Sequence, residues 1–301
     1  MTMEQPPILS IVTPTYNRAH TLLKCYQSLL VQTDQRFEWI LVDDGSTDDT
    51  PTVVEGFREH SFPMHYIRKE NGGKHRALNA AHPFIHGKYV LILDSDDALT
   101  PDAVEQVLHY WMQYENDPEI GVVTLLRGHD IEHPFCYAKD EFKAVDIFSY
   151  RRVILYSSDA CEVVRATVFL GNPFPEFPGE RFLAEGAFWG AISNLCKCVY
   201  VNKVIYLCEY IADGLTASGR RLRIRNPQGC MCNAHYGMAK KNRLKSRFKS
   251  GLQFTCYGFF AGKSPRQMAT LCNYKALMWC CLPFGWLLYL RWKKQYLRSK
   301  K

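Results

Sequence analysis

Residues 89–97, Tyr-Val-Leu-Ile-Leu-Asp-Ser-Asp-Asp, decide the fold of this chain. The first five are largely apolar and predict a buried strand, and the polar run that begins at Asp94 predicts its end. Two more such runs, Ile8–Thr13 and Glu38–Val42, also stop at polar clusters. We therefore expect several buried strands that each end in side chains able to do chemistry.

Helical patterns separate these strands, and the alternation predicts βαβ units in a mostly parallel sheet. The expected fold is α/β and Rossmann-like, with helices flanking the sheet. Ligands of such sheets bind beyond the carboxyl ends of the strands, so the polar clusters are expected to converge there. The other predicted strands are Met64–Arg68, Gly121–Leu125 and Cys198–Leu207. The predicted helices are Ala19–Leu30, a helix from Thr47 or Asp48 to about Glu59, Lys74–Ala81, a helix from Thr100 to about Tyr114, and half of Glu180–Leu195.

Asp94 and Asp96 place two carboxylates two residues apart at the end of a strand. Mg²⁺ and Mn²⁺ prefer oxygen ligands and commonly take one or two carboxylates together with substrate phosphates. The same residues could instead be a charge cluster that precedes the helix at Pro101. Their position directly after an apolar strand favours metal binding.

Two other clusters suit a nucleotide. Asp43 or Asp44 could accept a hydrogen bond from a nucleobase N–H while Tyr16 offers a face for stacking, or the carboxylates could simply form a turn and a helix cap. Lys74 opens a basic run after two glycines, at the start of a predicted helix. A helix N-terminus with nearby cations suits a diphosphate, and a solvated basic turn is the alternative.

Four motifs, in this order and spacing, resemble the family 2 glycosyltransferases of GT-A fold: Thr13–Arg18, Val42–Asp48, Gly72–Asn79 and Leu93–Asp97. The resemblance is close over residues 8–125 and looser to residue 215. It implies an inverting transferase of the bacterial surface-polysaccharide type, with a nucleotide-sugar donor, usually UDP-linked, and Mn²⁺ or Mg²⁺. It implies that Asp96 binds the metal and that the donor is bound by Pro14, Tyr16, Arg18, Asp43, Asp44, Lys74, Asn79, Asp94 and Ser95.

The pattern departs from the family at Leu78, where members often carry an arginine. Lys74 or Arg76 is expected to supply the missing positive charge. An inverting enzyme also needs one carboxylate to deprotonate the acceptor hydroxyl.

The segment 179–189 resembles the family's motif at the head of a helix under the acceptor site, and Glu185 is the base that it implies. Glu180 and Asp159 are the reserve candidates, and the alternative is that Glu185 only favours the positive end of a helix. Trp189 could stack on an acceptor sugar or lie in the core. Asp213 could help to close the site.

The charge of the chain is strongly divided. The whole chain has 301 residues and a formal net charge of +7, yet residues 214–301 contain 19 Lys and Arg and no Asp or Glu. The expected division is a catalytic domain over residues 1–215 and a basic, helical extension over residues 216–301. A hydrophobic content of 47% and a mean hydropathy of −0.23 exclude a disordered chain.

The extension contains an uncharged, Trp- and Leu-rich segment, Ala276–Leu290, that Pro283 and Gly285 are expected to interrupt. It is shorter than the roughly 20 residues of a membrane-spanning helix, so we expect an interfacial anchor beside an anionic leaflet. Helices packed on the catalytic domain, and nucleic-acid binding, are the alternatives. No secretory leader is recognised, and the 12 cysteines show no disulfide framework, so the expected location is cytoplasmic, peripheral on the inner face of the membrane.

Three functions remain open on the sequence. The favoured one is a metal-dependent hexosyl- or N-acetylhexosaminyltransferase that acts on a lipid-linked or polysaccharide acceptor. A sugar-nucleotidyltransferase would share the broad fold, but its first strand is followed by a glycine-rich loop, and Thr13–Arg18 contains no glycine. A non-catalytic module that binds a nucleotide-sugar is the third, and the presence of both Asp96 and Glu185 argues against it.

Overall fold

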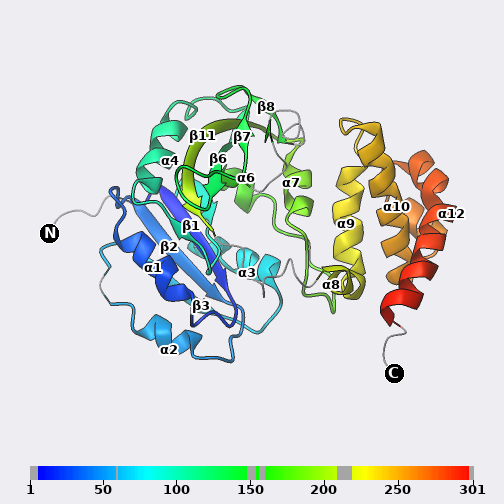
Figure 1. Ribbon diagram of the computed structural model, residues 1–301, viewed down its shortest axis with the longest axis horizontal. Coiled ribbons are helices and arrows are strands. Elements are labelled where there is room, and N and C mark those ends of the chain that lie inside the picture. The colour runs from blue at the N-terminus through cyan, green and yellow to red at the C-terminus, as the bar shows by residue number, and fades with distance from the viewer. Residues whose placement is uncertain (1–5, 59, 148–153, 156–159, 209–218, 298–301) are drawn as a thin grey trace. The chain divides into compact units, whose positions relative to one another are not determined.

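A computed structural model describes residues 6–58, 60–147, 154–155, 160–208 and 219–297 of the chain (Figure 1). It divides into two compact units. Unit 1 comprises residues 1–173 and 192–210, and unit 2 comprises residues 174–191 and 211–301. The expected domain boundary at residue 215 and the residue Asp213 fall outside the described residues.

A nine-stranded sheet forms the centre of unit 1. Its first four strands are parallel, as the alternating pattern predicts, and the next strand runs antiparallel to both of its neighbours. The short strand β8 (Val145–Asp146) adds to β11. In sheet order the others are β3 (Met64–Arg68), β2 (Phe37–Asp43), β1 (Leu9–Thr15), β4 (Tyr89–Ile92), β10 (Cys161–Arg165), β6 (Ile120–Gly128), β11 (Lys197–Leu207) and β5 (Ala98–Leu99).

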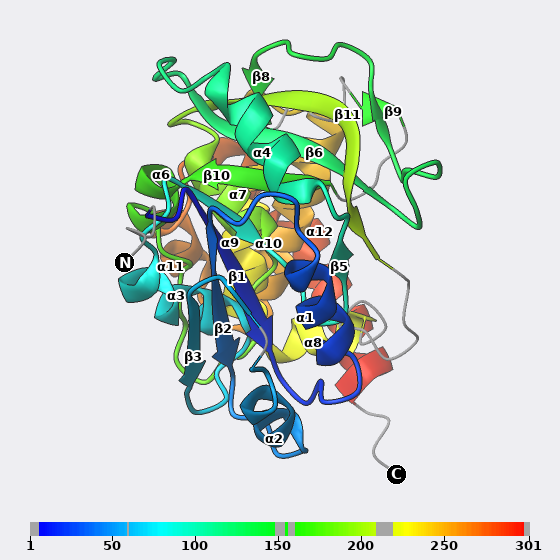
Figure 2. The same cartoon turned by 90° about the vertical axis from the view of Figure 1, so that its left-hand side faces the viewer.

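Both faces of the two strands β1 and β2 are covered. Every residue of β1 and β2 is buried, which is typical of a parallel strand between two layers of helix. Figure 2 shows β1, β2 and β3 side by side. The helices of unit 1 are α1 (Leu22–Leu30), α2 (Thr50–Glu55), α3 (Lys74–Ala80), α4 (Ala103–Met112) and α6 (Ala166–Leu170), with a 3₁₀ turn at His82–Phe84.

The register of the parallel strands fixes the edge at which the polar clusters meet. Thr15 pairs with Asp43 at the ends of β1 and β2, and Val12 pairs with Ile92 in β4. Because all three strands run the same way, the residues that follow them lie at one edge of the sheet. The convergence that the sequence predicts is therefore present.

Unit 2 is helical in its described part. Figure 1 shows α9, α10 and α12 packed side by side. Its helices are α7 (Gly186–Ile192, whose last residue belongs to unit 1), α8 (Gly219–Arg225), α9 (Pro227–Gly237), α10 (Leu244–Phe260), α11 (Pro265–Thr270), α12 (Lys275–Trp292) and a π-helical turn at Lys293–Leu297.

The expected interruption at Pro283 is wrong, because α12 continues through it. Gly285 explains the close packing of this helix on α10, since a Cβ at that position would collide with the side chain of Thr255. None of the helices over the described ranges is long and apolar enough to span a membrane.

Candidate active site

The turn after β2 is built around two buried carboxylates. Asp43 accepts the backbone N–H of Ser46 at 2.7 Å on Oδ1 and the hydroxyl of Tyr66 at 2.9 Å on Oδ2. Asp44 accepts Nζ of Lys69 at 2.7 Å. These bonds hold both side chains rigidly at the end of the strand.

Asp44 also ties the loop before α3 to this turn. Its Oδ1 accepts the N–H of Gly72 at 2.9 Å and its Oδ2 accepts the N–H of Gly73 at 2.6 Å. The carboxylate thus fixes the start of the helix that carries Lys74. Asp44 therefore holds the loop before α3 in place, in addition to the nucleotide contact that the resemblance implies.

The loop after β1 is joined to the loop after β2 through backbone N–H groups. Asn17 has a φ of 53°, and its N–H donates to Oγ of Ser46 at 2.9 Å. The next N–H, of Arg18, donates to Oγ1 of Thr50 at 3.0 Å. This bonding explains why α1 begins later than the pattern predicts. It leaves the ring of Tyr16 45% exposed, as a stacking surface must be.

Asp94 and Asp96 each face a cation from another segment of the chain, Lys74 at the start of α3 and Arg18 in the loop after β1. Nζ of Lys74 lies 2.5 Å from Oδ1 of Asp94, and Nη2 of Arg18 lies 3.5 Å from Oδ2 of Asp96. All four side chains are about a quarter exposed, so they remain open to a ligand. Burial alone would raise the pKa of Asp94, but Lys74 and Arg127 outweigh it and lower the pKa, which keeps the carboxylate ionised.

Tyr206 and Arg127 support this cluster from the two strands β11 and β6. The hydroxyl of Tyr206 accepts the backbone N–H of Asp94 at 2.9 Å and donates to Oδ2 of Asp97 at 2.8 Å. Burial raises the pKa of Tyr206 well above its ordinary value, so the hydroxyl keeps the proton that it donates. The guanidinium of Arg127 lies 4.1 Å from the centre of the Tyr206 ring.

Sequence reasoning missed both of these supporting residues. The only signal for Arg127 is one charge at the end of an otherwise apolar strand, and Tyr206 has none. Asp97 belongs to the fourth motif, but the pattern predicts no role for it. Burial, and then the negative charge of Asp94, raises the pKa of Asp97 to about 7.

The other residues predicted to bind the nucleotide-sugar lie near this edge of the sheet, and their side chains differ in solvent exposure. Ser95 is buried in the turn and Pro14 is buried in β1, paired with Val42. Asn79 is half-buried in α3. Leu78 is fully buried in the same helix, and Lys74 is a cation that lies next to Asp94.

Two of the three base candidates, Glu185 and Glu180, belong to unit 2. Glu185 directly precedes α7, and its carbonyl accepts the N–H groups of Phe188 at 2.9 Å and Trp189 at 3.1 Å. Glu180 is 5% exposed, and its two oxygens each accept an N–H at the start of α9, from Gln228 and Gly229 at 2.8 Å. Glu180 is thus a helix cap, which leaves Glu185 as the better candidate. The other reserve, Asp159, lies outside the described residues.

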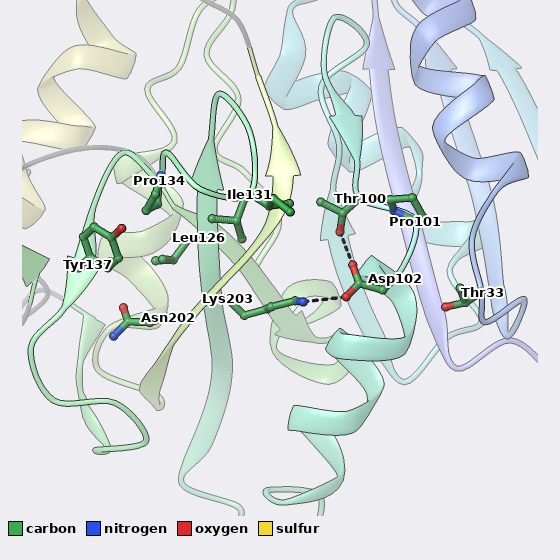
Figure 3. A pocket seen from close by; sticks show the side chains of 11 residues that line it. Thr33, Thr100, Pro101, Asp102, Leu126, Ile131, Pro134, Tyr137, Asn202 and Lys203 are labelled. Atoms are coloured by element: carbon green, nitrogen blue, oxygen red, sulfur yellow. Dashed lines mark hydrogen bonds and ion pairs between the residues drawn. The ribbon is translucent and has the colours of Figure 1, made fainter.

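Unit 1 also contains a cavity of about 460 Å³ (Figure 3). None of its lining residues is among the predicted site residues. Asp102 in its wall accepts Nζ of Lys203 at 2.8 Å and the hydroxyl of Thr100 at 2.7 Å. We assign it no ligand, because its charged groups already bind one another. Its walls are formed by Thr33, Thr100, Pro101, Asp102, Leu126, Ile131, Pro134, Tyr137, Asn202, Lys203 and Val204.

Comparison with protein families and curated proteins identifies relatives of the N-terminal part. Residues 10–152 match the family described as glycosyl transferase family 2. Glycosyltransferase GlyG of Streptococcus pneumoniae serotype 4 is 34% identical over 115 residues, 38% of this chain and 38% of that protein. Chondroitin synthase of Pasteurella multocida is 40% identical over 107 residues, 36% of this chain and 11% of that protein. The matched stretch therefore spans less than half of either relative.

Solved structures share the fold over nearly the whole chain. The S. aureus TarS 1–349 complex with UDP-GlcNAc has a TM-score of 0.62 at 17% identity, and covers 95% of this chain and 91% of that one. The mannosyltransferase PcManGT of Pyrobaculum calidifontis, in complex with GDP-Man and Mn²⁺, has a TM-score of 0.55 at 16% identity, covering 99% and 89%. At these identities the likeness shows the fold, which is the GT-A fold of glycosyltransferases.

Proposed function

Because residues 10–152 match glycosyl transferase family 2, we propose that this chain moves a sugar from a nucleotide-sugar, UDP-linked, to a hydroxyl of a lipid-linked or polysaccharide acceptor, with inversion. The observation that carries the proposal is the cluster at the carboxyl edge of the sheet. There, Asp94 and Asp96 face two cations. Lys74 comes from the start of α3 and Arg18 from the loop after β1. Paired opposite charges at this edge suit a diphosphate and its counter-ion.

The nucleoside would lie between the loop that follows β1 and the loop that follows β2. The exposed ring of Tyr16 offers a face for the base, and the carboxylates of Asp43 and Asp44 have lone pairs left for a base N–H. Lys74 stands at the first turn of α3, where the cation and the helix N-terminus both favour phosphate oxygens. UDP is the nucleotide of the TarS complex, which supports the choice of uridine.

Asp96 would hold the divalent cation. Its carboxylate is part-exposed and offers hard oxygen ligands, which suit Mn²⁺ or Mg²⁺. Mn²⁺ is named with the donor in the PcManGT complex, which supports this choice. When bound, the ion supplies positive charge that stabilises the leaving diphosphate. Arg18, whose Nη2 lies 3.5 Å from Oδ2 of Asp96, would place a further positive charge beside this site.

Glu185 would act as the general base. Its carboxylate takes the proton of the acceptor hydroxyl, whose oxygen forms a bond to the anomeric carbon. The bond from that carbon to the diphosphate oxygen breaks on the opposite face, and its electron pair leaves with UDP. Such a base contributes about 10²–10⁴-fold to the rate.

The test is a release assay with a panel of UDP-sugars, Mn²⁺ and a membrane lipid extract. We expect at least one donor to be consumed, and Glu185→Gln to abolish transfer while UDP still binds. Glu176→Gln is the matched control, because Glu176 is an exposed carboxylate of the same unit. A Glu185→Gln enzyme with normal turnover would remove Glu185 from the mechanism, and a panel without any active donor would refute the transferase.

We also propose that the enzyme is peripheral on the inner, anionic face of the cell membrane. Two of the apolar side chains that α12 leaves in solvent, Phe284 and Leu287, are both 62% exposed, and the helix begins at Lys275 and carries Arg291 in its last turn. The first turns of α10 are basic and carry the exposed Leu244. Apolar side chains rimmed by cations suit an interfacial helix.

Sedimentation with liposomes tests the membrane proposal. The full-length protein should bind vesicles that contain anionic lipid and should bind neutral ones weakly. The double variant Phe284→Ser/Leu287→Ser should lose this binding, whereas Leu195→Ser, at a 60% exposed leucine of unit 1, should retain it. Unchanged binding by the double variant would show that α12 is not the anchor. Nucleic acid added as a competitor tests the alternative that the basic extension binds nucleic acid, in which case it should displace the protein from the vesicles.

A further inference from the structure

A second cluster of metal-ligating side chains lies at the other edge of the sheet. Glu38 is the second residue of β2, His65 is the second residue of β3, and His86 shortly precedes β4. These positions are at the amino ends of the parallel strands. Asp43 is five residues further along β2 than Glu38, about 17 Å at 3.3–3.4 Å per residue. The cluster is therefore separate from the candidate active site.

The register of the sheet brings these side chains to one face. Glu38 pairs with Ser10 in β1, and Ile40, two residues further on, pairs with His65 in β3. Side chains two residues apart in a strand point the same way, as do those of directly paired residues. Glu38 and His65 consequently share a face, and the turn before β4 adds His86.

The carboxylate of Glu38 is oriented by the protein. It is 1% exposed, and its Oε1 accepts the hydroxyl of Ser10 at 2.5 Å and the backbone N–H groups of His86 at 2.6 Å and Gly87 at 3.1 Å. Its Oε2 lies 2.9 Å from Nδ1 of His86 and 3.7 Å from Nε2 of His65. One oxygen is thus held by protein donors while the other faces two imidazole nitrogens.

These distances suit a small dication. The ligand atoms of the three side chains all lie within 4.8 Å of one another. Tetrahedral Zn²⁺, with bonds of about 2.0–2.2 Å, requires separations of roughly 3.3–3.6 Å between its ligands. The 3.7 Å between Oε2 of Glu38 and Nε2 of His65 lies close to this range, and the 2.9 Å to Nδ1 of His86 lies about 0.4 Å below it. The two imidazole nitrogens lie within 4.8 Å of each other, so the exposed His86 ring has to shift by about 1 Å at most to complete the set.

We propose that Glu38, His65 and His86 form a binding site for Zn²⁺ that is independent of the donor-site cation. Two imidazoles and a carboxylate are a ligand set that suits a borderline-soft ion such as Zn²⁺. The carboxylate of Asp96 suits harder ions such as Mg²⁺ or Mn²⁺. The side chain of His86 is 59% exposed, so water can fill the fourth position. The ion would hold the beginnings of β2 and β3 and the turn before β4 together, in place of the hydrogen bond between the His86 imidazole and the buried carboxylate of Glu38.

The test measures Zn²⁺ binding to the metal-free, full-length protein by calorimetry and by thermal unfolding. We expect one equivalent to bind at this site and to raise the unfolding temperature. His86→Gln and His65→Gln should each weaken that binding at least tenfold, since each removes a ligand from a three-ligand site. His133→Gln is the control, because His133 is an exposed histidine paired only with its neighbour Asp130 in the described contacts. His86 is mostly exposed, so its variant should fold even if replacement of Glu38 does not.

Cobalt identifies the ligands directly. Co²⁺ bound by nitrogen and oxygen should show tetrahedral visible bands without the thiolate charge-transfer bands that any of the 12 cysteines would add. Absence of binding, binding that both histidine variants retain, or thiolate bands at one equivalent would each overturn the proposal. In the first case the cluster is only an ion pair of histidine and glutamate. None of these measurements depends on a sugar donor, so the outcome is separate from that of the transferase assay.

Discussion

Replacement of Tyr206 by phenylalanine should loosen the turn that carries Asp94 and Asp96. Tyr206 is fully buried, and phenylalanine occupies nearly the same volume, so the change removes the hydroxyl alone. That hydroxyl is the acceptor for the N–H of Asp94 at 2.9 Å and the donor to Asp97 at 2.8 Å. The variant therefore deletes two hydrogen bonds without creating a large cavity.

The expected cost follows from what each partner loses. A buried N–H left without an acceptor costs about 1–3 kcal/mol, and a hydrogen bond to a charged group contributes about 1.5–3 kcal/mol. Asp97 can offset part of its loss by taking up a proton, because its pKa already lies at about 7. We expect a loss of about 2–4 kcal/mol in the free energy of unfolding. For a unit of this size each kcal/mol corresponds to about 2–4 °C in the unfolding temperature.

Urea unfolding followed by tryptophan fluorescence measures the stability, and titration with UDP and Mn²⁺ measures the site. The variant should unfold at lower urea and bind UDP more weakly. Tyr137→Phe is the control, since Tyr137 is 42% exposed and should change neither quantity. If Tyr206→Phe matched the wild type in both measurements, the hydroxyl would not support the turn, and β11 would have no part in holding Asp94.

Three further predictions concern charge, metal and packing. Burial raises the pKa of Asp97 to about 7, so the folded state binds more protons than the unfolded state between about pH 4 and pH 7. As the pH rises through that window, the free energy of unfolding therefore falls by up to about 1.4 kcal/mol for each pH unit. The stability of Asp97→Asn relative to the wild type should therefore increase as the pH rises from 5 to 8. A difference in urea midpoint between the two proteins that stays constant over this range would contradict the raised pKa of Asp97. Asp96→Asn should weaken Mn²⁺-dependent UDP binding at least tenfold while leaving the unfolding temperature within a few degrees, and equal Mn²⁺ dependence in calorimetry would exclude Asp96 as the ligand. Gly285→Val should push α12 away from Thr255 on α10 and lower the free energy of unfolding by about 1–3 kcal/mol through overpacking. Ala276→Val, at an exposed position of the same helix, should leave the stability unchanged. Equal thermal unfolding of both variants, followed by helical circular dichroism, would count against the close contact.

The sequence predicted those parts of the site that depend on local order along the chain. The alternation of strands and helices indicated a parallel sheet, and parallel strands must end at the same edge. The pattern alone therefore places Asp43, Asp94 and Asp96 together. The contact of Lys74 with Asp94 comes from the structure, since the sequence indicated only that Lys74 opens a helix after two glycines.

Other assignments depended on partners that no local pattern reveals. Glu180 and Glu185 are five residues apart in one segment, yet Glu180 caps α9, 48 residues further along the chain. Asp44 looked equivalent to Asp43, but it binds the loop before α3. The helix around Pro283 continues because packing against α10 outweighs the local preference of proline to end a helix.

The sequence by itself determined the α/β class, the edge at which the site lies, and the concentration of positive charge in the last third of the chain. Only the tertiary structure decided that Arg127 and Tyr206 support Asp94, and that Glu38, His65 and His86 meet at the opposite edge. The reason is physical. Periodicity and turn residues record how each segment relates to its neighbours in sequence, whereas sheet order, such as the insertion of β10 between β4 and β6, sets which distant side chains come into contact.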